Sequence, residues 1–286
     1  MRLSTFPSSI QGLNGKYNTI EDCVERLSKA GFRYFAFGNS YIIGNGILYE
    51  KDWERKVNNL AAKTNQLGCA FLQAHAPYTF SKIRDLEYYR EMTDRLFQSA
   101  HILGVEQVVI HGYFQPDWTN PTTREQDFVR AYEFYMPFVE MAERLGFGIA
   151  VENLCNYEDP TMFTAKVEDQ LMLIEKLNAP HVSACWDSGH GFVAYGEDYP
   201  DQMKKLGKLI TCTHIHDNSH QRDLHLPPFM GTIDWNVFMK TLREIGYRGD
   251  LNFEIKKCLI PEHLLDLYLS FLYESGQTLI SMYENQ

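Results

Sequence analysis

The sequence lacks the segments that would direct a chain into or across a membrane. No stretch approaches about 18 uninterrupted apolar residues, so no membrane span is expected. The N-terminus has no charged region followed by an apolar run, so no signal peptide is expected. Cysteines stand at positions 23, 69, 155, 185, 212 and 258, and none forms a C-x-x-C pair. We therefore expect reduced cysteines in a cytoplasmic protein rather than a disulfide framework.

Basic residues are scarce relative to acidic ones. The chain has 27 Lys and Arg against 37 Asp and Glu, a net charge of -10 at pH 7. Proteins that grip a phosphate backbone usually carry a basic face, so no nucleic-acid partner is expected. A small anionic substrate is not excluded, because a single local Lys or Arg can bind one.

A Gly-rich phosphate-binding turn is also missing. The first predicted strand leads into Pro7-Ser8-Ser9 without G-x-G-x-x-G, the turn that usually follows the first strand of a doubly wound open sheet. What the sequence does contain is a regular alternation of short apolar runs with longer amphipathic stretches, which is typical of βα units around a parallel sheet. The expected strands are 3–8, 33–38, 69–75, 107–112, 148–153, 182–187, 209–215 and 251–256.

The helices expected between these strands complete the pattern. They are 19–30, 51–66, 84–103, 123–145, 164–177, 199–206, 234–245 and 262–283. Gly104, Gly146 and Gly246 suit the position that ends a helix, and Asp234 suits the cap that begins one. Eight strands and eight helices in 286 residues predict one (β/α)8 barrel, and no linker interrupts it, so we expect a single domain over 1–286.

Residues of the kinds that bind metals stand at the ends of six consecutive predicted strands. They are His75, His111, Glu152, Asp187, His214 and Glu254. In a barrel, the C-terminal strand ends meet at one rim, where three buried carboxylates would repel one another unless a cation lay between them. We therefore predict that Glu152, Asp187, His214 and Glu254 bind one divalent metal. The donors suit Mn²⁺, Co²⁺, Mg²⁺ or Zn²⁺ and do not choose among them.

Strand alternation extends this prediction to neighbouring residues. If Glu254 points into the barrel, Asn252 and Lys256 do so too, whereas Trp186 faces outward as a core residue. His216 shares the face of His214 but is expected further out, over the substrate. The residues expected to contact substrate are His190, His216, Arg222, Lys256 and Trp118.

This arrangement suits proton transfer on a sugar. A metal that chelates two neighbouring sugar oxygens polarises the carbonyl and stabilises an enediolate. Glu152 and Glu254, from the fifth and eighth strands, can flank the substrate as a general acid/base pair. Returning the proton to the opposite face of the same carbon is epimerisation, and returning it to the neighbouring carbon is isomerisation. The sequence distinguishes neither epimerisation from isomerisation nor a free sugar from a sugar phosphate.

The motifs resemble a known family. His75-Ala76-Pro77-Tyr78, Val151-Glu152-Asn153, Asp187-Ser188-Gly189-His190, His214-Ile215-His216-Asp217 and Phe253-Glu254 look like the sugar phosphate isomerase/epimerase family of the xylose isomerase-like TIM barrel superfamily. The segment from Asp223 to Trp235 also resembles the family. The resemblance implies a (β/α)8 barrel and a Glu/Asp/His/Glu metal site with two catalytic glutamates. The resemblance also implies that ketose 3-epimerases and inosose dehydratase-like enzymes are relatives.

The same superfamily contains AP endonucleases of the endonuclease IV type, which hold three zinc ions. The residues that fall where the nine ligands of that type would be are His75, His111, Glu152, Asp187, His190, His214, Asp223, His225 and Glu254. A multinuclear zinc site is therefore an alternative. The acidic charge, the few basic loop residues and the continuation Leu154-Cys155-Asn156 after Glu152-Asn153 count against DNA repair. A dehydratase acting on a cyclitol or keto sugar, a non-catalytic sugar-binding protein, and a homodimer or homotetramer stay open.

Overall fold

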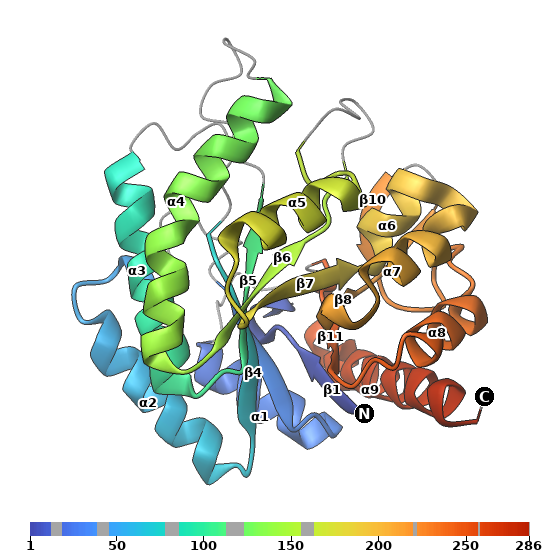
Figure 1. The fold of residues 1–286 in the computed structure, drawn as a ribbon. Coiled ribbons are helices and arrows are strands. Elements are labelled where there is room, and N and C mark those ends of the chain that lie inside the picture. The colour runs from blue at the N-terminus through green and yellow to red at the C-terminus, as the bar shows by residue number, and fades with distance from the viewer. Residues whose placement is uncertain are drawn as a thin grey trace.

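A closed barrel of eight parallel strands forms the centre of the molecule (Figure 1). The computed structural model describes residues 1–12, 19–38, 46–77, 86–112, 123–155, 163–219, 222–256 and 258–285. In chain order the barrel strands are β1 (Arg2–Thr5), β3 (Tyr34–Gly38), β4 (Ala70–His75), β5 (Gln107–His111), β6 (Gly148–Glu152), β7 (Val182–Asp187), β8 (Ile210–Ile215) and β11 (Asp250–Phe253). Strand β11 pairs with β1 and closes the barrel. The predicted fold class is confirmed.

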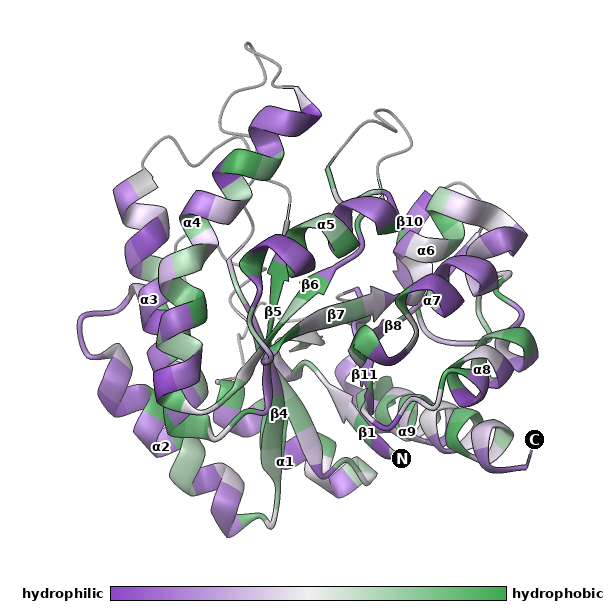
Figure 2. Ribbon diagram, viewed as in Figure 1, coloured by the Kyte–Doolittle hydropathy of each residue, from purple (hydrophilic) through white to green (hydrophobic). Residues whose placement is uncertain are grey.

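Helices surround this barrel. They are α1 (Ile20–Ala30), α2 (Trp53–Gln66), α3 (Leu86–Leu103), α4 (Arg124–Leu145), α5 (Val167–Leu177), α6 (Ser188–Tyr195), α7 (Tyr199–Leu206), α8 (Trp235–Glu244) and α9 (Glu262–Glu284). Their polar faces turn outward, while the strands they cover are largely apolar (Figure 2). Among the described residues, no helix is long and apolar enough to cross a membrane.

The outward faces of the strands form the main core with the helices. Phe35, Trp186 and Phe253 lie in this core with no exposed surface, which confirms the outward orientation predicted for Trp186. The helix ends predicted from glycines are confirmed as well. Gly104 and Gly146 follow their helices with φ of 69° and 85°, a conformation that glycine adopts without a steric penalty.

Several element boundaries differ from those predicted. Strand β1 ends at Thr5 because Pro7–Ser9 form a 3-10 turn, and β11 ends at Phe253 rather than at 256. Helix α5 begins at Val167 rather than at 164. Helix α6 was not expected at all, because its sequence SGHGFVAY contains two glycines, which disfavour helices.

Two short strand pairs were also missed, because segments of three to five residues carry too little periodicity to detect. Strand β2 (Ile10–Gly12) pairs with β12 (Cys258–Ile260). Strand β9 (Asp217–Ser219) pairs with β10 (Arg222–Leu226) as a hairpin that follows β8. This β9–β10 hairpin matters for the site, because it carries Asp223 and His225.

The barrel interior has an apolar half and a polar half. Small side chains from β5 to β8 form the first half: Val109, Ala150, Cys185 and Cys212. The second half is a polar floor made by Ser4, Gln73, Asp250 and Asn252, all buried. Such barrels are usually filled by branched apolar residues, so a polar floor beneath the strand ends is unusual.

Candidate metal centre

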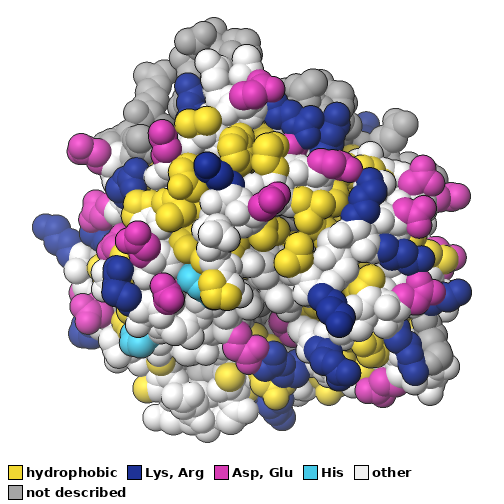
Figure 3. All heavy atoms as spheres, in the orientation of Figure 1, with side chains coloured by type: hydrophobic (Ala, Val, Ile, Leu, Met, Phe, Trp, Pro, Cys, Tyr) yellow, Lys and Arg dark blue, Asp and Glu magenta, His cyan; other side chains and the backbone are white. Residues whose placement is uncertain are grey.

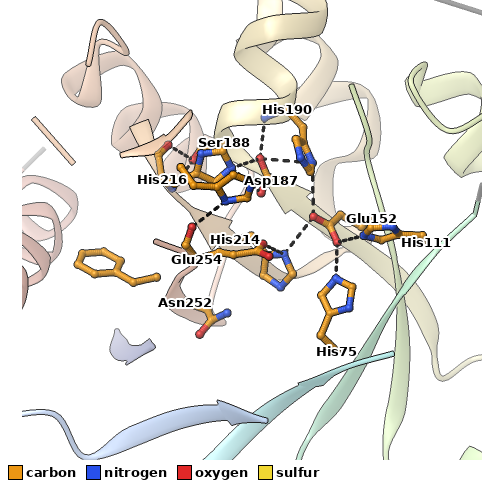
Figure 4. Close-up of polar contacts among 12 residues, drawn as sticks. His75, His111, Glu152, Asp187, Ser188, His190, His214, His216, Asn252 and Glu254 are labelled. Atoms are coloured by element: carbon orange, nitrogen blue, oxygen red, sulfur yellow. Dashed lines mark hydrogen bonds and ion pairs between the residues drawn. The ribbon is translucent and has the colours of Figure 1, made fainter. Parts of the chain in front are cut away.

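Four side chains meet at the C-terminal mouth of the barrel, as the sequence predicts. Glu152 ends β6, Asp187 ends β7, His214 lies near the end of β8, and Glu254 directly follows β11. Each of these four residues, the inner quartet, offers one ligand atom, and these atoms all lie within 4.8 Å of one another. All four side chains are buried and point into one space (Figure 4).

Glu152 is surrounded by imidazoles. Its Oε2 lies 3.0 Å from His75 Nε2 and 3.2 Å from His111 Nε2, and its Oε1 lies 3.0 Å from His214 Nδ1. Burial raises the pKa of Glu152, but the histidines, His214 foremost, outweigh it and hold that pKa well below its usual range. The side chain is therefore a carboxylate at neutral pH.

Glu254 faces the same imidazole from the other side. Its Oε2 lies 2.8 Å from His214 Nδ1, so one ring nitrogen is shared between two glutamates. Burial raises the pKa of Glu254, but the His214 imidazole more than offsets it and lowers that pKa. Burial in turn lowers the pKa of His214, and the two carboxylates then raise it well above its usual value.

Asp187 is held by a helix as well as by its strand. It is the N-cap of α6, and its Oδ1 accepts the backbone N–H of His190 at 2.6 Å. The Asn153 side chain accepts the N–H of Asp187 at 2.7 Å and donates to its carbonyl at 3.1 Å. His216 Nε2 lies 2.9 Å from Oδ1 of the same carboxylate. Asp187 is therefore fixed in position before any ligand binds.

A second group of possible ligands lies beside the inner quartet. His190, His216, Asp223 and His225, the outer cluster, also place one ligand atom each within 4.8 Å of one another. Asp223 Oδ2 lies 3.1 Å from His225 Nε2 and 3.4 Å from His190 Nε2. Burial lowers the pKa of His225, but Asp223 outweighs it and raises that pKa to about 9. His225 has a φ of 48°, a conformation that costs a non-glycine residue energy and is enriched at functional sites.

The structure places the other predicted substrate contacts as follows. His216 is fully buried, its Nε2 lies 2.9 Å from Asp187 and its ring stacks on that of His225, so its contact with substrate stays a prediction. Lys256 is exposed and lies beyond β11, which ends at Phe253, so strand alternation does not determine its orientation. Arg222 is exposed at the start of β10. Trp118 lies outside the described residues.

Sequence reasoning missed two residues that hold the site in shape. Asn153 braces Asp187, as described above, although it stands within a quoted motif. Asp217 accepts the backbone N–H groups of Asn218 and Ile233 at 2.9 and 3.1 Å and the indole N–H of Trp235 at 3.0 Å. In the sequence, the only indication of a role for Asp217 was its place in the motif His214-Ile215-His216-Asp217. The three bonds tie the β9–β10 hairpin and the segment after it to the end of β8.

The donor set fits a divalent cation. Three carboxylates lie within reach of one another in a buried space, and a divalent cation between them would offset their mutual repulsion. Buried carboxylates are strongly disfavoured unless paired or bound to a metal. Oxygen donors with one imidazole suit a hard to borderline ion such as Mn²⁺ or Zn²⁺. Glu152, Asp187, His214 and Glu254 are therefore the residues that would hold it.

Comparisons with known proteins agree with this architecture. A chain titled D-tagatose 3-epimerase-like protein superposes with a TM-score of 0.78 at 19% identity, covering 100% of this chain and 99% of that one, which shows the shared fold. An uncharacterized protein of Methanocaldococcus jannaschii is 28% identical over 62% of this chain and 61% of its own length. The D-psicose 3-epimerase of Agrobacterium fabrum is 23% identical over 49% of this chain and 46% of its own length.

The chain thus spans about half the length of the curated relatives it matches. The family model for the xylose isomerase-like TIM barrel matches residues 24–273, which is most of the chain and includes all of the inner quartet and the outer cluster. The chain belongs to the xylose isomerase-like TIM barrel family.

Proposed function

We propose that this protein is a divalent-metal-dependent isomerase or epimerase of a sugar or sugar phosphate. The observation that carries the proposal is the position of Glu152 and Glu254, two buried carboxylates on either side of His214 Nδ1. Similarity to proteins named as a D-psicose 3-epimerase and an inosose isomerase supports the substrate class. A bound divalent ion would polarise the substrate carbonyl and stabilise negative charge on the neighbouring oxygens.

The protein's own residues account for the proton transfers. Both glutamates are held ionised by imidazoles, so each can accept a proton at a carboxylate oxygen. In an isomerisation, Glu254 takes the proton from the carbon next to the carbonyl and returns it to the neighbouring carbon. In an epimerisation, Glu152 first takes up a proton from solvent and then gives it to the opposite face of the enediolate, while Glu254 keeps the proton that it removed. The outer cluster, with His190 and Asp223 facing each other, offers donors and acceptors for the remaining hydroxyl groups.

Deuterium exchange tests this function directly. Ketoses, aldoses and their phosphates are incubated with the protein and Mn²⁺ in D₂O, and the sugars are analysed by mass spectrometry. We expect deuterium at the carbon next to the carbonyl of at least one sugar, together with its epimer or isomer. Exchange absent from every sugar and sugar phosphate, in a protein that retains a bound divalent ion, would contradict the proposal.

The second candidate is a multinuclear zinc enzyme of the endonuclease IV type. It is favoured by one observation: besides the inner quartet, two further groups of potential ligands meet here, the outer cluster and His75–Glu152–His214. Against it, acidic and basic side chains are interspersed on the face that carries α4, α5 and α7 (Figure 3), and the net charge is -10. Metal analysis and an abasic-site oligonucleotide separate the two functions. Three zinc ions with strand cleavage would favour the nuclease, and about one ion without cleavage favours the isomerase or epimerase.

A further inference from the structure

The polar floor of the barrel lies directly beneath a residue of the inner quartet. Asn252 on β11 is registered against His214 on the neighbouring β8, and Figure 4 shows its side chain below the His214 ring. Ser4 Oγ donates to Asn252 Oδ1 at 3.0 Å and also contacts the Asp250 carboxylate. Gln73 Nε2, from β4 across the barrel, donates to Asp250 Oδ1 at 2.9 Å. The four residues therefore form one connected network.

Three buried polar atoms of His214 and this network have no protein partner within the described part of the chain. They are His214 Nε2, Asn252 Nδ2 and Gln73 Oε1. The residues that carry them are at most 1% exposed. A buried polar group without a hydrogen bond costs about 1 to 3 kcal/mol, so each of these three atoms is expected to have a partner.

The chemistry of these atoms identifies that partner. His214 Nδ1 lies 3.0 Å from Glu152 and 2.8 Å from Glu254, on the side where a metal would bind. Nε2, on the other side of the ring, carries a hydrogen both in the imidazolium and in an imidazole whose Nδ1 binds a metal. His214 Nε2–H and Asn252 Nδ2–H are then donors, whereas Gln73 Oε1 is an acceptor. A water molecule can accept two hydrogen bonds and donate one here, and two to four polar partners are what a buried water needs.

We propose that an ordered water binds beneath His214, between its Nε2, Asn252 Nδ2 and Gln73 Oε1, and that Asn252 is a positioning residue for this imidazole. The water fixes the Nε2–H tautomer and the ring orientation, so that Nδ1 points at the metal position. Ser4 and Asp250 hold Asn252 and Gln73 in place. Metal-binding histidines usually donate their second N–H in this way, and losing the partner typically weakens metal binding 10- to 100-fold.

The experiment has a structural arm that does not depend on metal or turnover. A high-resolution crystal structure is expected to show density for one water within hydrogen-bonding distance of His214 Nε2 and Asn252 Nδ2. ¹⁵N spectra of histidine-labelled protein are expected to show a hydrogen on His214 Nε2. Well-defined density without a water at this position would overturn the proposal.

The second arm measures Mn²⁺ affinity and rests on the proposed metal site. Asn252→Leu, which keeps the branched shape and the number of heavy atoms and removes the donor, is expected to weaken Mn²⁺ binding 10- to 100-fold. Val109→Ala truncates the apolar half of the same barrel interior and is expected to leave affinity unchanged. Ser4→Ala, which frees the Asn252 amide, replaces Asn252→Leu if that variant does not fold.

The outcomes separate the two proposals. Unchanged Mn²⁺ affinity in Asn252→Leu or its replacement would remove the positioning role. Wild-type protein that binds no divalent ion would overturn the proposed function and this role together, while the density still decides whether the water is present. Sugar turnover enters neither arm, so failure to find a substrate does not affect the result.

Discussion

Replacing Glu254 with glutamine tests the proposed proton transfer at the atom that performs it. The amide keeps nearly the same shape, and two backbone contacts of this residue are unaffected. Its N–H donates to the carbonyl of Ile215 at 3.1 Å, and its own carbonyl is 2.8 Å from His225 Nδ1. We therefore expect Glu254→Gln to fold like the wild-type protein and to lose chemistry rather than structure.

The size of the loss follows from what the carboxylate contributes. An amide cannot take a proton from carbon at neutral pH, so the variant loses the contribution of a positioned general base, about 10²- to 10⁴-fold. This corresponds to an activation free energy higher by about 2.7 to 5.5 kcal/mol. One of the three carboxylates of the inner quartet is also neutralised, so metal affinity falls and the comparison is made at saturating Mn²⁺.

The assay follows deuterium incorporation from D₂O into a sugar that the wild-type protein turns over, with thermal unfolding measured in parallel. Glu140→Gln makes the same chemical change at an exposed position on α4 and is expected to exchange like the wild type. An exchange rate in Glu254→Gln equal to that of the wild type, at saturating metal, would refute the assignment of Glu254 as the base.

Two further predictions concern residues that support the site, and a third concerns an exposed ion pair between helices. Asp217→Ala removes the acceptor of three buried hydrogen bonds. We therefore expect denaturant titrations to give a free energy of unfolding lower by about 4 kcal/mol, and a decrease below about 1 kcal/mol would contradict this. Gly189→Ala places a Cβ 1.9 Å from His216 Cε1. We therefore expect a lower unfolding temperature and weaker Mn²⁺ binding, both measured by calorimetry. Unchanged values would show that α6 can shift to make room for the methyl group. Hydrogen bonds from Lys63 lower the pKa of Glu25 from 4.5 to about 2. The ionised side chain therefore stabilises the fold above pH 4.5, and this stabilisation is lost as the pH falls toward 2. The stability gap between wild type and Glu25→Gln should close over that interval in pH-dependent unfolding, and a gap independent of pH would contradict the pairing.

The inner quartet was predictable because its residues stand at or just after the ends of parallel strands, and parallel strands bring their ends to one rim. Alternation was informative for Trp186, which lies within β7, but it does not apply to Lys256, which lies beyond the end of β11. Periodicity describes only residues that are held in a strand. His216 lies between β8 and β9, so alternation does not determine its orientation either.

The remaining errors arise from contacts between distant parts of the chain. Gln73 and Asp250 are 177 residues apart in sequence, and nothing local to either shows that they bond across the barrel. Helix α6 was hidden by Gly189 and Gly191, which lower helix propensity, and it forms because Asp187 caps it and the core covers Phe192. Tertiary contacts thus decided what local signals left open.

The two groups of ligands stand on parts of the chain with different freedom to change. Three members of the inner quartet belong to strands that are paired on both sides, so altering their backbone would disturb the whole barrel. Asp223 and His225 instead stand on the β9–β10 hairpin, which is outside the barrel and is anchored through Asp217. A hairpin with a different sequence that keeps this anchor would exchange half of the outer cluster, and the present hairpin's hydrogen bond to the inner quartet, from His225 Nδ1 to the backbone carbonyl of Glu254, does not involve the Glu254 carboxylate. Under the proposed function, the residues around the substrate could therefore change while the two carboxylates stay in place.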